Sequence, residues 1–336
     1  MNNDRDYSMD FIRITAMVLI IFMHTPIPNV GTPGPVLSSL SFFTAPGIGL
    51  FFMISGALLL WNELSQRDFL KKRFSKVLWP TLFWTGVYIG VKFITTPSSV
   101  SYTAITILSI PFSAQGHGVL WFMYTLAGLY LLTPILSKWL KNASRKEIEF
   151  YLLLWCITLL YPYLKLVLKI NMEPSGILYY FTGYCGYFLL GYYIKTHILP
   201  RSIRRTTLLW SCATVIACFL LVYLAKKIDD SVNIIDLFWY LSLPVAIMCV
   251  AYCMLLSQVQ VPNRFKTVVT KLSTLSFGVY LCHILIMRTL LWNINFIHNC
   301  GAIIHIPIVA ILTIILSWLL AFSFSKLPFS KYIIGV

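Results

Sequence analysis

Three ionisable side chains lie in the first apolar segment, residues 7–25: Asp10, Arg13 and His24. At about 100° per residue, a helix places Arg13 and His24 on one face, with Asp10 one turn before Arg13. A rise of ~1.5 Å per residue separates Arg13 from His24 by about 16 Å along the helix. Because ionisable groups are costly inside a membrane, the pattern indicates a functional site. The alternative is an Asp10–Arg13 pair at one interface, with His24 among the opposite headgroups.

A second group of cations precedes the third apolar segment. Lys72, Arg73 and Lys76 share one face of a helix at i, i+1 and i+4, on the same side of the membrane as Arg13. Arginine and lysine both bind phosphate, so this group predicts an anion site. The alternative is a basic anchor that contacts lipid headgroups.

Polar residues recur late in the chain, between positions 276 and 283. Ser276, Tyr280 and His283 share a helical face at i, i+4 and i+7. We expect His283 to lie nearer to His24 than to Arg13. Because functional and structural buried histidines look alike in sequence, His283 is interpreted either as part of a site or as a hydrogen-bonded core residue.

Aromatic and small residues mark two further stretches. Trp121 and Tyr124 open the fourth apolar segment, where such side chains usually anchor a helix at the membrane surface and are also suited to stacking on a sugar. Ser55 is followed by Gly56, but no GxSxG motif surrounds it, so we interpret this pair as close helix packing. The same interpretation applies to Gly86, Gly90 and the glycines between 183 and 191.

The composition is typical of an integral membrane protein. Of 336 residues, 58% are hydrophobic and 11% are charged, with a mean hydropathy of +0.79, whereas soluble domains carry about 25% charged residues. The apolar runs predict an all-α bundle of about ten transmembrane helices in one domain, residues 1–336. The expected spans are 8–25, 43–62, 74–95, 118–138, 148–168, 176–196, 206–226, 235–256, 269–290 and 302–324. The run at 104–112 is too short to cross and is expected to be interfacial or re-entrant.

The distribution of charge predicts the orientation. Most of the 26 lysines and arginines fall in the segments that alternate helices place on one side. The positive-inside rule makes that side cytoplasmic, and both termini with it. The net charge of +15 is therefore explained by topology and by anionic lipid, without nucleic acid. The eight cysteines form neither a CxxC pair nor a zinc-binding spacing, so we expect no metal.

Cations on the inner side and histidines on the outer side of one bundle predict an enzyme. Such an enzyme would bind an anionic, phosphate-bearing donor from the cytosol and act on a hydroxyl near the outer face. His24 is the expected general base, because histidine titrates near neutral pH. Asp10, Arg13 and His283 are the other candidate catalytic residues.

These residues resemble the acyltransferase 3 family of integral membrane acyltransferases, in particular the branch that O-acetylates surface polysaccharides. The landmarks run in family order over nearly the whole chain. They are Arg13 with His24, Phe51–Gly56, Lys72-Arg73 through Pro80, Trp121–Tyr124 with Tyr130 and Pro134, Tyr184–Gly191, and Ser276–His283. One departure is His117, which stands four residues before Trp121, whereas members of this branch often carry a histidine closer to that tryptophan.

The resemblance implies a bacterial cytoplasmic-membrane enzyme with acetyl-CoA, or another acyl-CoA, as its cytoplasmic donor. It implies a sugar hydroxyl of an exported or lipid-linked glycan as acceptor, and His24 as general base or transient acyl carrier. It also implies that Arg13 and Arg73 hold the CoA phosphates. The predicted donor-binding residues are Arg13, Lys72, Arg73 and Lys76, and the predicted acceptor-binding residues are Trp121, Tyr124, Ser276 and Tyr280.

Two alternatives stay open at this point. The first is a transporter or flippase whose arginine and histidines line a substrate or proton path. The sequence shows no internal repeat with paired broken helices, which is the usual sign of a secondary transporter. The second keeps the enzyme class and changes the acceptor to a small molecule, an amino acid or a lipid. The expected partners are the lipid bilayer, acyl-CoA and a glycan acceptor, and the oligomeric state is open.

Overall fold

The computed structural model describes residues 5–26, 40, 42–61, 64–95, 104–105, 108–109, 120–198, 209, 211–217, 220, 223, 227 and 239–336. Within these ranges every regular element is a helix and no strand occurs. The all-helical class expected from the apolar runs is confirmed.

The helices begin and end close to most of the predicted boundaries. Their bounds are α1 Tyr7–His24, α3 Pro46–Leu59, α4 Gln66–Phe69, α5 Ser75–Thr95, α7 Trp121–Asn142, α8 Arg145–Thr158, α9 Tyr161–Leu168, α10 Cys185–Tyr193, α13 Leu243–Leu256, α14 Asn263–Thr289, α15 Asn295–His298, α16 Ala302–Ser325 and α17 Ser330–Ile333. Shorter turns are π-helical at Leu70–Phe74 and Ile194–Ile198, and 3-10 at Tyr179–Phe181 and Leu291–Asn293.

Six helical stretches among the described residues are long and apolar enough to cross a membrane. They are Tyr7–His24, Phe42–Leu59, Gln66–Thr95, Arg145–Leu166, Asn263–Asn293 and Ala302–Ser325. Helix α13 is apolar but shorter. The expected span at 206–226 lies largely outside the described residues, as does most of the run at 104–112. The total of ten spans and the cytoplasmic termini stay predictions.

Helix α16 shows the side-chain arrangement of a membrane helix. Ile311 and Ile315 are 53% and 49% exposed on its outer face. His305, Thr313 and Ser317 are fully buried on its inner face. A lipid environment favours apolar side chains on the outer face of a helix and polar side chains on its inner face. The described part of the chain is therefore built as a membrane protein.

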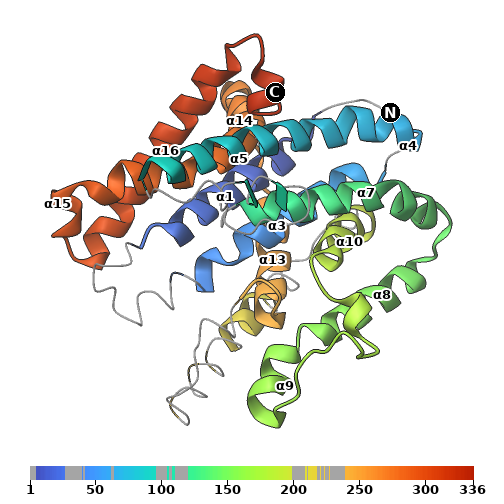
Figure 1. Ribbon diagram of the computed structural model, residues 1–336. Coiled ribbons are helices and arrows are strands. Elements are labelled where there is room, and N and C mark those ends of the chain that lie inside the picture. The colour runs from blue at the N-terminus through green and yellow to red at the C-terminus, as the bar shows by residue number, and fades with distance from the viewer. Residues whose placement is uncertain are drawn as a thin grey trace.

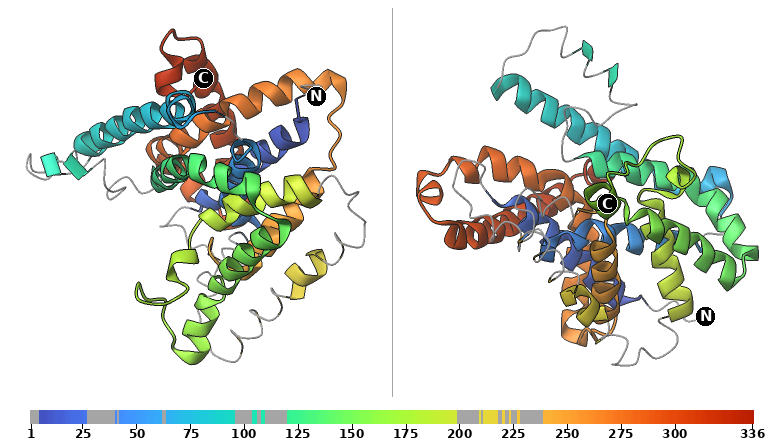
Figure 2. Two further views of the ribbon diagram at one scale, coloured as in Figure 1. Left: turned by 90° about the vertical axis from the view of Figure 1, so that its right-hand side faces the viewer. Right: turned by 90° about the horizontal axis from the view of Figure 1, so that it is seen from below.

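The helix with the ionisable residues lies at the centre of the bundle. Helix α1 packs against α3 and α14, and α14 packs against α16 (Figure 1). Helix α3 also packs against α10 and α13. Helices α8 and α9 lie on the opposite side of the bundle from α16 in both figures (Figure 2). This arrangement surrounds α1 with other helices, so its charged side chains face protein.

Two glycines let α3 and α10 approach backbone to backbone. A Cβ at Gly56 would lie 1.8 Å from the carbonyl oxygen of Phe188, and one at Gly191 would lie 1.9 Å from that of Met53. Close packing is therefore confirmed at these positions. It is wrong for Gly86, Gly90 and Gly183, where a Cβ would meet nothing within 4 Å.

The predicted cation cluster lies where a helix changes its geometry. Residues Gln66–Thr95 form one helical stretch, in which the π-helical turn Leu70–Phe74 joins α4 to α5. The second half of α5 projects from the bundle (Figure 2). A π-helical turn pairs i with i+5, so it changes the direction in which the following residues point. Lys76 therefore faces differently from Lys72 and Arg73.

Candidate active site

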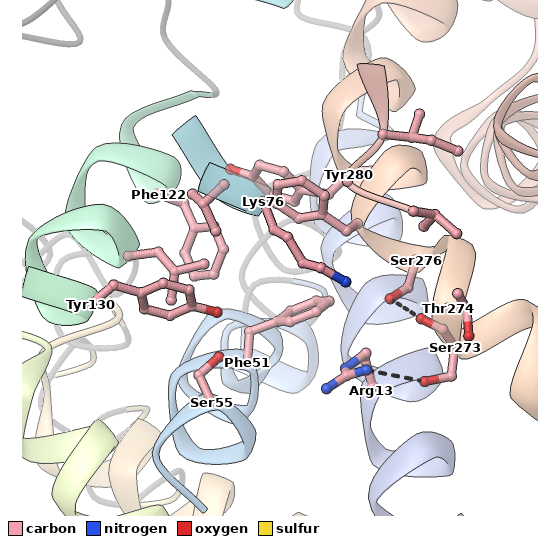
Figure 3. A pocket seen from close by; sticks show the side chains of 16 residues that line it. Arg13, Phe51, Ser55, Lys76, Phe122, Tyr130, Ser273, Thr274, Ser276 and Tyr280 are labelled. Carbon is pink, nitrogen blue, oxygen red and sulfur yellow. Dashed lines mark hydrogen bonds between the residues drawn. The ribbon is translucent and has the colours of Figure 1, made fainter. Parts of the chain in front are cut away.

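A cavity of about 190 Å³ lies between α1, α3, α5, α7 and α14 (Figure 3). It combines two cations with several hydroxyl groups, and none of its described lining residues is Asp or Glu. The lining residues are Arg13, Phe51, Ser55, Lys76, Val77, Phe122, Leu126, Tyr130, Ser273, Thr274, Ser276, Phe277, Tyr280, Ile334, Gly335 and Val336. A cavity with this lining is suited to an anion with an apolar extension.

Arg13 enters the cavity from α1 and is held by α14. Its Nη1 donates a hydrogen bond to Ser273 Oγ over 3.4 Å, and Ser273 Oγ donates to Asp10 Oδ1 over 2.6 Å. Asp10 forms its ion pair with Arg5, at 2.5 Å from Nε. This hydrogen bond raises the pKa of the Arg5 guanidinium above its ordinary value. The carboxylate that the sequence allowed as a partner for Arg13 is thus paired with another arginine.

Lys76 is the member of the predicted cation cluster that reaches the cavity. Figure 3 shows its ammonium group and the Arg13 guanidinium pointing into the same space. Lys72 and Arg73 are exposed and do not line it. The shared face predicted for the three is lost because the π-helical turn ends between Arg73 and Lys76. Arg73 still lies close enough to act electrostatically on Arg13.

The hydroxyl groups come from three helices. Ser276 and Tyr280 of α14 line the cavity, and Ser276 Oγ donates to the Ser273 carbonyl over 2.7 Å. Ser55 of α3 and Tyr130 of α7 also line it (Figure 3). From the sequence, Ser55 was interpreted as close helix packing and Tyr130 as part of the family resemblance, and neither was assigned to the site. Tyr130 stands nine residues beyond Trp121 and six beyond Tyr124, and this spacing alone carries no signal for a cavity.

The two predicted histidines meet next to this cavity. The ring centroids of His24 and His283 are 5.5 Å apart, and those of Tyr280 and His283 are 5.4 Å apart. His283 Nδ1 lies 2.6 Å from the Tyr280 carbonyl oxygen, so Nδ1 carries the proton in that bond. Its Nε2 is buried and has no hydrogen-bond partner among the described residues. Tyr280 therefore links the cationic cavity to the histidine pair.

The predicted aromatic contacts lie beside this site and do not line the cavity. The Trp121 ring stacks on Tyr240, with centroids 5.6 Å apart, and lies 5.2 Å from Tyr184. The Tyr240 hydroxyl contacts Met23 Sδ over 3.4 Å, next to His24 in the chain. Tyr124 is partly buried and packs on the core. Trp121 is thus connected to the histidine end of α1.

Two remaining expectations concern a metal site and His117. The described residues contain no group of three or more His, Cys, Asp or Glu side chains that could hold a metal ion. His117 lies outside the described residues.

A family model described as an acyltransferase domain matches residues 6–322, almost the whole chain. The chain belongs to the acyltransferase 3 family. No curated protein and no solved structure matches it. The resemblance to this family inferred from six short stretches is confirmed. The matched residues of this acyltransferase include both histidines and the cavity-lining residues from Arg13 to Tyr280.

An acyltransferase needs three things from such a site. It must hold an activated acyl donor, remove the proton of the acceptor and exclude water from the acyl group. The Arg13–Lys76 end of the cavity is suited to a donor anion. The His24–His283 pair is suited to proton transfer, with His283 fully buried and His24 partly exposed.

Proposed function

We propose that this acyltransferase moves an acyl group, most simply acetyl, from cytoplasmic acyl-CoA to a sugar hydroxyl of a surface or lipid-linked polysaccharide. The observation that carries the proposal is the position of Tyr280, which lines the cationic cavity and contacts His283, whose ring in turn lies 5.5 Å from that of His24. The donor binds with its phosphates at the cations and its thioester toward the histidines.

The donor end rests on two cations with different geometries. Arg13 offers a planar guanidinium fork and Lys76 a compact ammonium group, and both bind phosphate. Arg73 adds to the positive potential without lining the cavity. The helical rise of about 16 Å between Arg13 and His24 suits an extended pantetheine arm.

The chemical step uses His24 as general base. His24 accepts the proton of the acceptor hydroxyl as the oxygen attacks the thioester carbonyl carbon. The C–S bond then breaks, the acyl group stays on the sugar oxygen as an ester, and the CoA thiolate takes the proton back from His24. His283 keeps Nε2 as an acceptor beside His24, because its Nδ1 is bonded to the Tyr280 carbonyl.

The acceptor approaches from the histidine side. Trp121 stacks near the end of α1 that carries His24, and its ring suits contact with a sugar face. Ser276 and Tyr280 supply hydroxyl groups on the cavity wall, and Tyr124 packs one turn beyond Trp121. The positive-inside pattern supports a donor site on the cytoplasmic side, and the family resemblance implies the bacterial cytoplasmic membrane.

The test is transfer of a labelled acetyl group. Purified protein in lipid nanodiscs receives acetyl-CoA labelled in the acetyl group and an extract of membrane glycans. The proposal predicts label in the glycan and an equal amount of free CoA. Binding of CoA without transfer to any glycan would move the acceptor to another class. Neither binding nor transfer would overturn the donor assignment and favour the transporter alternative.

A further inference from the structure

A carboxylate stands one helical turn from the proposed phosphate-binding arginine. Asp10 and Arg13 are at i and i+3 of α1, a spacing at which an Asp–Arg pair normally forms across a turn. Asp10 is only 6% exposed, so its charge is poorly screened by water. A direct pair with Arg13 would place a negative charge where the donor phosphate must bind.

Arg5 holds this carboxylate from the other side. Arg5 Nε donates to Asp10 Oδ2 over 2.5 Å, and Nη2 donates to Oδ1 over 3.1 Å. This is the bidentate arrangement that makes arginine–carboxylate pairs strong and directional. Arg5 does not line the cavity. It therefore neutralises Asp10 without adding a ligand to the donor site.

On the side of α14, Ser273 forms hydrogen bonds with both Asp10 and Arg13 and so lies between them. A hydroxyl has one proton, and that of Ser273 is donated to Asp10 Oδ1 over 2.6 Å. Its oxygen is then left to accept from Arg13 Nη1, over 3.4 Å. Because guanidinium only donates, the direction of both bonds is determined. Ser273 is 1% exposed, so water does not replace it easily.

We propose that Arg5 and Ser273 are positioning residues that keep Asp10 away from Arg13 and so leave the Arg13 guanidinium free for the donor phosphate. The proposal rests on the donor assignment made above and adds two residues that assignment does not contain. It has an unusual consequence: removing the remote cation Arg5 weakens anion binding because Asp10 then turns to Arg13. Removing the Asp10 charge as well restores binding.

The test measures CoA affinity of the full chain in nanodiscs by calorimetry. We expect Arg5→Ala to weaken CoA binding about tenfold, the scale of one partly buried charge contact, and Arg5→Ala/Asp10→Asn to return close to wild type. Arg5→Lys, which keeps the charge, should lose less. Lys146→Ala is the matched control, because it removes an exposed cation at the start of α8, away from the cavity.

Ser273 is tested by a conservative rescue. We expect Ser273→Ala to raise KM for acyl-CoA with little change in kcat, and Ser273→Thr, which keeps the hydroxyl, to recover most of the affinity. Melting temperatures of all variants separate misfolding from altered binding.

The outcomes separate the two proposals. A wild type that binds no CoA overturns the donor assignment itself. Loss of binding in Arg13→Ala, with wild-type affinity in Arg5→Ala and Ser273→Ala, overturns only the positioning role. Weak binding in Arg5→Ala that Asp10→Asn fails to restore also overturns it, because the loss then comes from something other than the freed carboxylate.

Discussion

Arg13 and Lys76 both face the cavity, but they are held in different ways. The Arg13 guanidinium is bonded to Ser273, which orients it, whereas Lys76 enters from α5 on a flexible four-carbon stem. In the proposed donor site, two cations from different helices would give the phosphates two directions of contact. At the scale of single residues, the proposed donor end consists of the side chains that reach the cavity.

The cation cluster offers a matched pair of variants. We expect Lys76→Ala to weaken CoA binding several-fold, about 1 kcal/mol or more, because it removes a charge that lines the cavity. Lys72→Ala should leave the affinity near wild type, since Lys72 is exposed and lies off the cavity. Both are measured by calorimetry with CoA. Equal losses in the two variants would indicate a diffuse positive field instead of a defined site.

Sequence spacing predicted some of the residues that the structure brings together, but not how they meet. The His24–His283 approach follows from the depth of each residue in its helix, and the structure places the rings 5.5 Å apart. The position of Ser273 between Asp10 and Arg13 depends on the register of α14 against α1, which no local pattern encodes. Ser55 was missed for the same reason, because its cavity contact requires knowing which helix faces it.

At the scale of elements, two local features position the site. The glycines at the α3–α10 contact allow backbones to touch, which fixes α3 and its cavity residues Phe51 and Ser55. The π-helical turn at Leu70–Phe74 stands directly before the segment from which Lys76 reaches the cavity. The sequence indicated the first feature through its small residues. It gave no sign of the second, because π-helical turns have no spacing pattern of their own.

The α3–α10 contact predicts which glycine-to-alanine substitutions destabilise the protein. Gly56→Ala and Gly191→Ala each force a Cβ to within 2 Å of a facing carbonyl oxygen (1.8 Å and 1.9 Å), so the helices must separate. Overpacking of this kind costs about 1–3 kcal/mol, and we expect lower melting temperatures in detergent. Gly128→Ala is the control, because nothing lies within 4 Å of its Cβ. Melting temperatures unchanged in all three variants would contradict the close approach.

At the scale of the whole molecule, the distribution of charge predicts how the protein is oriented in the membrane, and the burial of polar residues shows where its polar groups lie. Basic residues gather on one side of the predicted topology, and the cavity cations belong to that side. The polar inner face of α16 shows that the interior, and not the lipid-facing surface, carries the polar chemistry. Under the predicted topology, the proposed donor enters from the cytoplasm and the proposed acceptor from the opposite side.

Orientation is tested by thiol labelling. We expect Lys146→Cys to react with a membrane-impermeant maleimide only in inverted vesicles, and Lys169→Cys only in intact spheroplasts, because the predicted topology places them on opposite sides. The wild-type chain measures the background from its own cysteines. Labelling of both positions from one side would contradict the topology.

The most direct test of the central claim is to measure CoA affinity and CoA release from acetyl-CoA side by side in wild type, Arg13→Ala and His24→Ala. If donor binding and proton transfer lie at two ends of one site, Arg13→Ala loses affinity. His24→Ala keeps wild-type affinity but releases CoA about 10²–10⁴-fold more slowly. A folded His24→Ala protein that still releases CoA at the wild-type rate would contradict the account.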